Sequence, residues 1–266
     1  MPETNADIVE TPYETLQRVA GWIASSKRVV VLTGAGISTD SGIPDFRGPD
    51  GLWRRDPRAR QMATLQHYMA DRDARVAAWR ARLEHPAWSA SPNAAHVALV
   101  ELERRGKLDT LITQNIDGLH QSAGSSPEKV VEIHGTIREV MCMSCSRTGP
   151  MQGALERVRS GEDDPPCTSC GGILKSATVS FGQSVSPDLL ERARRAVDSC
   201  DLLLALGTSL VVFPVAYLPQ RALLAGARLV IMNAGVTRYD GRSHACVRAP
   251  LGRCLPEVLN LLGAAR

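Results

Sequence analysis

The stretch RVVVLTGAGISTDSG, residues 28–42, sets the expected fold class. Residues 28–33 form a short β-branched and apolar run that ends in glycine, which is typical of a buried strand in a parallel sheet. The glycines that follow allow the backbone to approach a pyrophosphate, and amides at the next helix start can receive its charge. Thr39 stands where the pattern G-x-G-x-x-G has its third glycine, so a structural turn without a ligand is the alternative.

Three similar apolar runs follow along the chain, at residues 110–113, 201–206 and 228–232. Segments with helical periodicity lie before and between these runs. Strands that alternate with helices indicate an α/β fold, here a Rossmann-like, doubly wound parallel sheet. The helices are expected at residues 11–26, 94–106, 187–199 and 214–226.

Two regions interrupt this alternation, and they predict a smaller inserted lobe. Residues 48–107 are expected to form a helical lid insertion, and residues 139–175 carry paired cysteines. The larger Rossmann-like domain then comprises residues 1–47, 108–138 and 176–266. A cleft between two lobes is a common place for a ligand.

The paired cysteines predict a metal site. Cys142 and Cys145 form one C-x-x-C knuckle, and Cys167 and Cys170 form a second after 21 intervening residues. Four thiolates at this spacing are typical of a zinc ribbon, with one structural Zn²⁺ per chain because no coordination position stays open. A redox-active pair is the minor alternative. The other three cysteines, Cys200, Cys246 and Cys254, are expected in the core or as incidental residues.

Composition indicates an ordinary globular protein, with 44% hydrophobic and 22% charged residues. The formal net charge of +3 does not indicate a nucleic-acid partner. Basic residues gather at 54–60 and 72–82, where solvated surface is the expected role and a face for acidic protein or anionic substrate is the alternative. No window is apolar enough for a membrane span, and the polar N-terminus does not resemble a secretory signal. We therefore expect a cytoplasmic protein.

Three segments carry side chains suited to chemistry. The loop 43–49 brings an acid, an aromatic and a base in succession, so it is a candidate lid, with a plain surface loop as the alternative. Residues 113–120 follow a strand end, where amides and a carboxylate can bind a polar ring or can cap turns. His134 closes an apolar run before a glycine, so it is a candidate general base or a buried core histidine.

Together these features resemble the sirtuin family, in its bacterial type. The resemblance extends from about Val29 to the C-terminus. The motifs that carry it are GAGISTDSGIPDFRG (34–48), TQNIDGLH (113–120), IHG (133–135), the four cysteines, FG (181–182), GTSL (207–210) and Asn233.

The resemblance implies an NAD site and two catalytic residues, His134 as general base and Asn115. Phe46 would shield the reacting ribose, and Arg47 would lie near the phosphates. Asn233 and the segment near Cys254 would hold the adenosine end. The full set implied for the cofactor is Gly34, Ala35, Gly36, Asp45, Phe46, Arg47, Gln114, Asn115, Asp117, Gly207, Thr208, Ser209, Asn233 and Cys254.

It also implies acyl-lysine protein substrates, whose backbone would add as a strand between residues 179–182 and 210–213. The substrate contacts would come from Val179, Phe181, Gly182 and Val212. The implied activity is NAD-dependent lysine deacylation, most simply deacetylation, which releases nicotinamide and O-acyl-ADP-ribose. A protein mono-ADP-ribosyltransferase at the same site and a non-catalytic NAD or ADP-ribose sensor are the alternatives. The oligomeric state is left open.

The sequence departs from the family pattern at two places. Gln183 stands where many sirtuins have an acid after Phe-Gly, so the peptide edge lacks a negative charge that would favour basic substrates. Desuccinylase-type sirtuins carry a Tyr-x-x-Arg pair in the acyl tunnel, and the equivalent here is Trp79-x-x-Arg82. This difference argues against a preference for acidic acyl groups, although Arg82 keeps the question open. Gly51-Leu52-Trp53 is also similar to the family, without an assigned role.

Overall fold

The computed structural model describes residues 12–48, 51–55 and 63–264. The remaining parts of the expected domains, residues 1–11, 49–50, 56–62 and 265–266, lie outside this description, and so does most of the basic run 54–60. No helix in the described ranges is long and apolar enough to cross a membrane.

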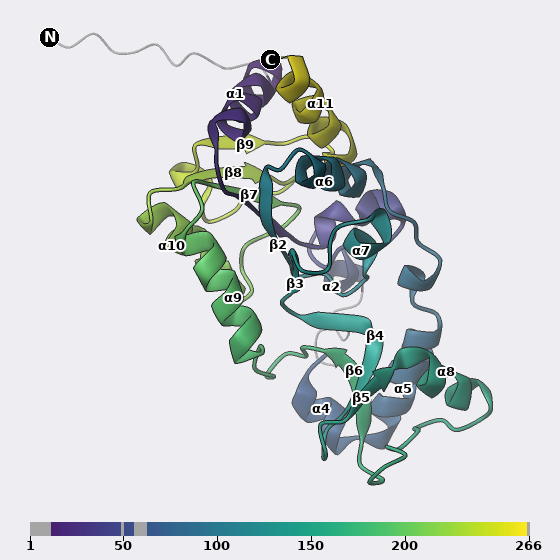
Figure 1. Ribbon diagram of the computed structural model, residues 1–266. Coiled ribbons are helices and arrows are strands. Elements are labelled where there is room, and N and C mark those ends of the chain that lie inside the picture. Colours follow the sequence, from purple (N-terminus) through teal and green to yellow (C-terminus); the bar gives the residue numbers. More distant parts are fainter. Residues whose placement is uncertain (1–11, 49–50, 56–62, 265–266) are drawn as a thin grey trace, which may run out of the picture.

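A six-stranded sheet forms the larger part of the molecule (Figure 1), and all of its neighbouring strands are parallel. The order is β3-β2-β1-β7-β8-β9, so the chain builds outward from β1 in one direction and from β7 in the other. The expected doubly wound α/β fold is confirmed. The strands are β1 (Val29–Thr33), β2 (Leu108–Thr113), β3 (Val130–Glu132), β7 (Leu202–Leu206), β8 (Arg228–Met232) and β9 (Ala245–Val247).

Alternate residues of each strand pack into two separate cores. Val29 and Val31 face one core, and Val30 and Leu32 face the other, because successive side chains of a strand point to opposite faces. Helices α1 (Pro12–Ser25), α6 (Ala94–Arg104) and α11 (Leu251–Ala264) cover the first face. Helices α9 (Pro187–Asp198) and α10 (Leu218–Leu224) cover the second.

Most of these elements were expected from the sequence, with two exceptions. The strand β9 and the helix α11 had not been predicted. The helix α11 contains Pro256, which interrupts a helical pattern in sequence, and β9 has only three residues.

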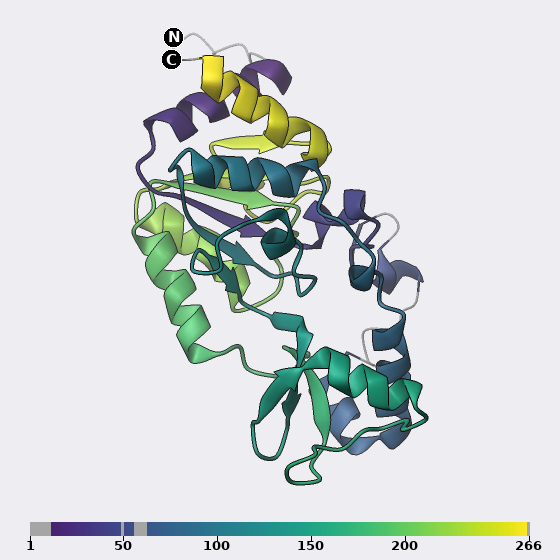
Figure 2. The same ribbon diagram turned by 45° about the vertical axis from the view of Figure 1, so that its right-hand side comes forward.

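The smaller lobe lies at one end of the molecule, opposite α1 and α11 (Figure 2). Its antiparallel sheet has the order β5-β4-β6, made of β4 (Gly135–Cys142), β5 (Thr148–Pro150) and β6 (Leu174–Thr178). Strands β4 and β6 therefore continue across the expected boundaries near residues 138 and 176, and the domain division stays a prediction. The helices of this lobe are α4 (Leu65–Ala70), α5 (Arg72–Leu83) and α8 (Met151–Arg159).

Short elements connect these parts. They are η1 (Ala35–Ile37), η2 (Thr39–Ser41), α2 (Leu52–Arg55), η3 (Pro86–Trp88), α7 (Leu119–Ala123), η4 (Val215–Tyr217) and η5 (Asp240–Arg242). The strand order reverses between β1 and β7, and ligands of open α/β sheets bind at the carboxyl ends of the strands at such a point.

Candidate functional site

The glycine turn after β1 lies against the end of β7, at this reversal of strand order. The amide of Gly34 donates to Leu206 O at 3.1 Å, and the amide of Gly36 donates to Gly207 O at 2.9 Å. A Cβ on Gly36 would lie 2.8 Å from the Cα of Gly207, which itself has a φ of +59°. Glycine is required at both positions, because any side chain would force the two strand ends apart.

Polar side chains from the end of β2 converge on this turn. Gln114 donates through Nε2 to Thr208 Oγ1 at 2.9 Å. The buried Asn115 donates through Nδ2 to Gly34 O at 3.2 Å and to Ser38 Oγ at 3.1 Å. Both amide hydrogens of Asn115 are thereby used, which leaves its Oδ1 as an acceptor for a ligand.

Asp117 completes this group with a carboxylate that is 4% exposed. Ser38 donates to its Oδ2 at 2.8 Å, and the amide of Leu119 donates to its Oδ1 at 2.9 Å. These bonds satisfy a charge that burial alone would disfavour. Ser38 had not been singled out as a site residue; its place within the glycine turn was the signal that could have found it.

His134 lies between β3 and β4, and its ring is oriented by the backbone of Gln114. Its Nδ1 lies 3.1 Å from Gln114 O. A carbonyl oxygen only accepts, so Nδ1 carries the hydrogen and Nε2 presents a lone pair. Burial lowers the pKa of His134 below its usual 6.5, partly offset by this backbone hydrogen bond. The imidazole is therefore neutral at pH 7, as a general base must be.

A buried network supports this site from below. Thr33 and Thr113, at the ends of β1 and β2, share a hydrogen bond of 2.8 Å between their hydroxyl groups. Thr113 Oγ1 also accepts from the amide of Asn115 at 3.1 Å, and His120 Nε2 lies 3.1 Å from Thr33 Oγ1. Burial lowers the pKa of His120 to about 3, so the ring stays neutral. These residues, which sequence reasoning had not assigned, fix Asn115 relative to the glycine turn.

The four cysteines of the smaller lobe form the expected metal site. Their sulfur atoms all lie within 4.8 Å of one another, with Cys142 and Cys170 3.5 Å apart and Cys145 and Cys167 3.9 Å apart. Zn–S bonds of about 2.3 Å in a tetrahedron place sulfurs about 3.8 Å apart. Backbone amides of Ser144 and Ser169 point at Cys142 and Cys167, as thiolate sulfurs require. The site thus fits a structural Zn²⁺ held by four protein ligands.

Comparison with known proteins agrees with this geometry. Residues 34–214 match the model of the Sir2 family. The chain belongs to the Sir2 family, the sirtuins. A relative from Streptomyces coelicolor, named NAD-dependent protein deacetylase 2, is 50% identical over 88% of this chain and 98% of its own length. NAD-dependent protein deacetylase 1 of Pyrobaculum aerophilum is 41% identical over 96% of this chain and 97% of its own length.

Solved sirtuin structures share the fold over nearly the whole chain. One of them, from work on the mechanism and regulation of Sir2 enzymes, has a TM-score of 0.86 at 37% identity. The match covers 95% of this chain and 99% of the solved chain. A Sir2 complex with a p53 peptide and NAD⁺ has a TM-score of 0.84 at 33% identity and covers 94% of this chain and 99% of its own.

The residues of the candidate lid loop in this sirtuin belong to an aromatic cluster. Phe46 is 43% exposed, and its ring centroid lies 5.2 Å from that of Trp53. Trp53 in turn lies 5.5 Å from Phe181, and the guanidinium of Arg47 lies 4.1 Å above its ring. Trp53, which had no assigned role, therefore links the lid loop to the proposed peptide edge. Asp45 holds the loop by accepting from the amide of Gly48 at 2.9 Å.

The two proposed peptide edges differ in how many of their backbone groups are already paired. Phe181 exchanges backbone hydrogen bonds with Ala63 and Leu65, and the amide of Val179 donates to His134 O at 2.8 Å. The amide of Ser180 donates to the side chain of Gln183 at 3.1 Å. On the second edge, the amide of Leu210 donates to Thr208 Oγ1 at 3.3 Å, and Val212 O accepts from the amide of Ala216 at 2.8 Å. Leu210 is buried with a φ of +54°, whereas Val211 and Phe213 are about half exposed.

The expected cofactor residues are not all gathered at the glycine turn. Ala35 and Ser209 are half-buried beside Gly34 and Gly207 in the chain. Asn233 follows β8, where its side chain donates to Gly235 O at 2.8 Å. The thiol of Cys254 lies in the core, 1% exposed, with its sulfur 3.9 Å from that of Met232. The structure therefore does not bring this thiol to the polar cluster formed by Gln114, Asn115 and Asp117 at the glycine turn.

The pair Trp79-x-x-Arg82 lies inside the smaller lobe. Trp79 is 2% exposed in the core of the smaller lobe. Arg82 donates to Ser176 Oγ at 3.0 Å, and burial lowers its pKa. Lys175 lies nearby and donates to the carbonyls of Ser176 and Thr178; burial, followed by the charge of Arg82, lowers its pKa to about 8. Both cations are thus bonded to neutral oxygens of the lobe.

Proposed function

We propose that this chain is an NAD-dependent protein lysine deacylase, most simply a deacetylase, in which His134 is the general base. The observation that carries the proposal is the hydrogen bond of His134 Nδ1 to Gln114 O, which leaves Nε2 free as a base. The same histidine accepts, through its carbonyl, the amide of Val179 at the proposed peptide edge. One residue thereby joins the polar cluster to the place where a substrate would bind.

The residues of the polar cluster fit the two parts of NAD nearest the reaction. When bound, NAD would supply the ribose that accepts the acyl group and the nicotinamide that leaves. The Oδ1 of Asn115 and the buried Asp117 would hold the nicotinamide and its ribose, while Gly36, Thr208 and Ser209 would lie along the phosphates. Fixed donors and acceptors of this kind lower a barrier by positioning, since they need no reorganisation during the reaction.

His134 would take a proton from a ribose hydroxyl through Nε2. Because its pKa is lowered by burial, the base form persists below pH 6.5 and is lost only as the pH falls through the folded-state pKa. Phe46 and Trp53 would exclude water from the reacting ribose, which protects a reactive centre from hydrolysis. The relatives named NAD-dependent protein deacetylase and the Sir2 complex with deacetylated p53 peptide and 3′-O-acetyl ADP-ribose support this assignment.

We propose a small neutral acyl group as the preferred one. Trp79 packs in the core of the smaller lobe, so this chain lacks the tyrosine hydroxyl that a Tyr-x-x-Arg pair would offer to an acyl carboxylate, and Arg82 donates to Ser176. We further propose a cytoplasmic location, because seven free cysteines suit a reducing compartment. The acylated target is expected to be a protein rather than a small molecule.

Incubation of the purified protein with acetyl-, longer aliphatic and succinyl-lysine peptides, with and without NAD, tests the proposal. Mass spectrometry should show free lysine, nicotinamide and O-acyl-ADP-ribose only when NAD is present. The His134→Ala variant should lose about 10²–10⁴-fold in kcat while still binding NAD. His67→Ala, a histidine of the smaller lobe, is the matched control and should keep full turnover.

The outcomes separate the alternatives. NAD consumption with ADP-ribose attached to a protein, but with no deacylated peptide, would replace the deacylase with a mono-ADP-ribosyltransferase. NAD binding without turnover would leave a sensor. Deacylation that persists in His134→Ala would remove this histidine from the role of base.

A further inference from the structure

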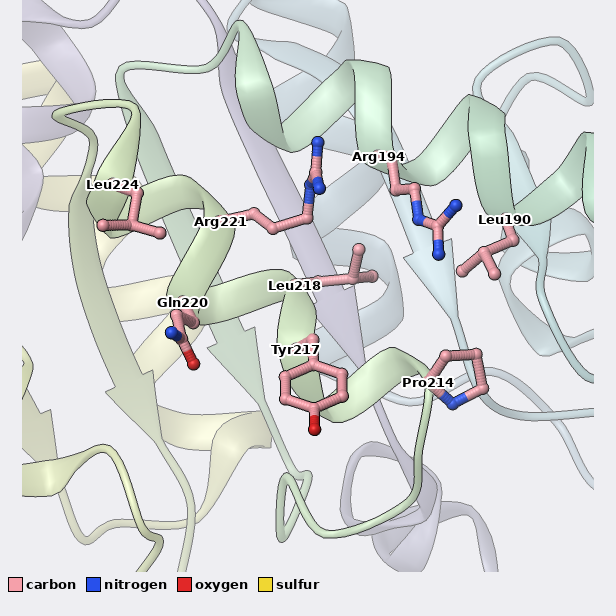
Figure 3. Close-up of a pocket in the computed structure, with 8 residues that line it drawn as sticks. All are labelled: Leu190, Arg194, Pro214, Tyr217, Leu218, Gln220, Arg221 and Leu224. Carbon is pink, nitrogen blue, oxygen red and sulfur yellow. The ribbon is translucent and has the colours of Figure 1, made fainter.

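A groove separate from the polar cluster lies on the outer surface between α9 and α10 (Figure 3). Its volume is about 250 Å³. Leu190 and Arg194 project into it from α9, and Leu218 and Leu224 line it from α10. Pro214 forms part of its wall directly after Phe213, so the groove begins one residue beyond the proposed peptide edge.

The surface from the peptide edge to this groove is unusually apolar. Val211 is 45% exposed and Phe213 is 49% exposed at the edge, while Tyr217 is 51% exposed and Leu224 is 76% exposed in the groove. The rings of Phe213 and Tyr217 lie 4.5 Å apart, so the two regions are continuous. A contiguous apolar strip on a protein surface marks a site for another macromolecule.

The charged groups along the strip carry a small positive excess, because three arginines stand against two carboxylates. Arg221 is paired with Asp198, so its charge is largely matched. Arg194 forms no ion pair with any residue in the described ranges, and Arg238 lies 5.5 Å above the ring of Phe213 at the other end of the strip. Glu191, on α9, lies close enough to act on Arg221 and forms no ion pair within the described part of the chain.

The peptide edge itself adds no negative charge. Gln183, directly after residues 179–182, is uncharged, and its side-chain oxygen accepts from the amide of Ser180. A substrate with basic residues around its lysine therefore gains no electrostatic attraction at this edge. Acidic residues in a substrate would instead lie near the positive charges of Arg194 and Arg238. Complementary charge of this kind speeds association and selects partners.

We propose that this groove docks a segment of the acylated protein that combines acidic and apolar residues and lies near the acyl-lysine. The inference rests on the proposed function, because it places the substrate backbone at residues 210–213. Apolar side chains of the segment would pack on Tyr217 and Leu224, and a carboxylate would pair with Arg194. The enzyme would then prefer proteins carrying such a segment over short acetyl-lysine peptides.

Steady-state kinetics on matched peptides test this proposal. A short acetyl-lysine peptide of about seven residues serves as reference, and longer peptides carry alternating Asp-Leu or Lys-Leu blocks on either side, at about 3.3 Å per residue. The Asp-Leu peptide should have the highest kcat/KM. Arg194→Glu and Leu224→Asp should each lower that value by about tenfold, and Arg194→Glu should raise the value for the Lys-Leu peptide.

Two controls keep the result interpretable. Arg195→Glu makes the same charge change on an exposed face of α9 and should leave kcat/KM unchanged for all three peptides. All variants should keep the wild-type kcat/KM on the short peptide, which shows that they are folded and active. Equal kcat/KM for the three peptides in the wild type would overturn the proposal.

A binding measurement separates failure of the groove from failure of the proposed function. A fluorescent Asp-Leu peptide without acyl-lysine should bind the wild type and not Arg194→Glu, as measured by anisotropy. Binding without deacylation of any peptide would overturn the proposed function alone. No binding by the wild type, or equal binding by Arg194→Glu, would overturn the groove. Sedimentation that shows a dimer, abolished by Leu224→Asp, would assign the groove to a second copy of this chain instead.

Discussion

The parallel sheet and the smaller lobe are held together by different interactions. Among the residues that the structure describes, the sheet separates two cores of 27 and 19 buried residues, whereas the core of the smaller lobe has nine, of which two are the cysteines Cys142 and Cys167. Burial of apolar surface stabilises a fold roughly in proportion to its area, so a small core supplies little. The smaller lobe therefore depends on its metal site and on ion pairs to hold a defined shape.

The ion pairs of this lobe connect its two insertions. Arg75 of α5 pairs with Asp164 at 2.8 Å in a partly buried position, and it also donates to the carbonyls of Tyr68 and Met69. Asp164 lies in the loop between the two cysteine knuckles. The helical insertion and the metal site are thus fixed to each other. Phe181, in the segment after β6, is joined to the helical insertion through its backbone bonds to residues 63 and 65.

Loss of the metal should give the largest effect. Removal of zinc by a chelator, or Cys145→Ser, should lower deacetylation by about 10²-fold or more, because the lobe that carries one side of the peptide edge loses its cross-link. The sheet should stay folded and keep NAD affinity, as measured by calorimetry. Cys246→Ser, a cysteine outside the cluster, is the control. Metal analysis well below one zinc per chain in the active wild type would contradict the site.

A smaller effect should follow from breaking the ion pair between the insertions. Arg75→Ala should destabilise the smaller lobe by about 3 kcal/mol, because it leaves Asp164 partly buried and unpaired. Arg80→Ala should destabilise the lobe by only about 0.5 kcal/mol, because Arg80 and Asp163 are exposed and their charged atoms, Nη2 and Oδ1, lie 3.5 Å apart. Hydrogen exchange of β4 and β6 measures the difference. Equal effects of the two changes would show that Arg75 is not a structural link.

The smallest effect should come from mild acid, and it acts on both regions. Burial lowers the pKa of His120, beneath the sheet, to about 3 and that of His85 to about 4. Protons therefore bind the unfolded chain first, so stability is full above pH 6.5 and falls as the pH drops toward these values. Between pH 7 and pH 6 each of these histidines should lower the free energy of unfolding by less than about 1 kcal/mol. Urea titrations at several pH values, with His120→Gln as comparison, measure the slope; a flat profile would contradict it.

The two regions also differed in how far the sequence predicted them. The strands of the sheet were confirmed because β1 and β7 are continuous apolar runs, a pattern that buried parallel strands require. The cysteine knuckles were predicted because metal coordination fixes ligand type and spacing within a few residues. The helix α11 was not predicted, since Pro256 hides its periodicity. The sequence suggested a place in an acyl tunnel for Trp79. It could not show that Trp79 lies in the core of the smaller lobe, because that depends on the packing of α5 against α8.

The sequence by itself determined the alternating α/β pattern, the position of the glycine turn, the four metal ligands and the candidate base His134. Each of these is recorded in neighbouring residues, so local chemistry is enough to find it. Only the tertiary structure decided which nitrogen of His134 is free, that both amide hydrogens of Asn115 are used, and where Trp53 and Arg82 point. Most of these depend on contacts between segments 20 to more than 120 residues apart. No local pattern encodes the geometry of such contacts, because packing of the whole chain sets it.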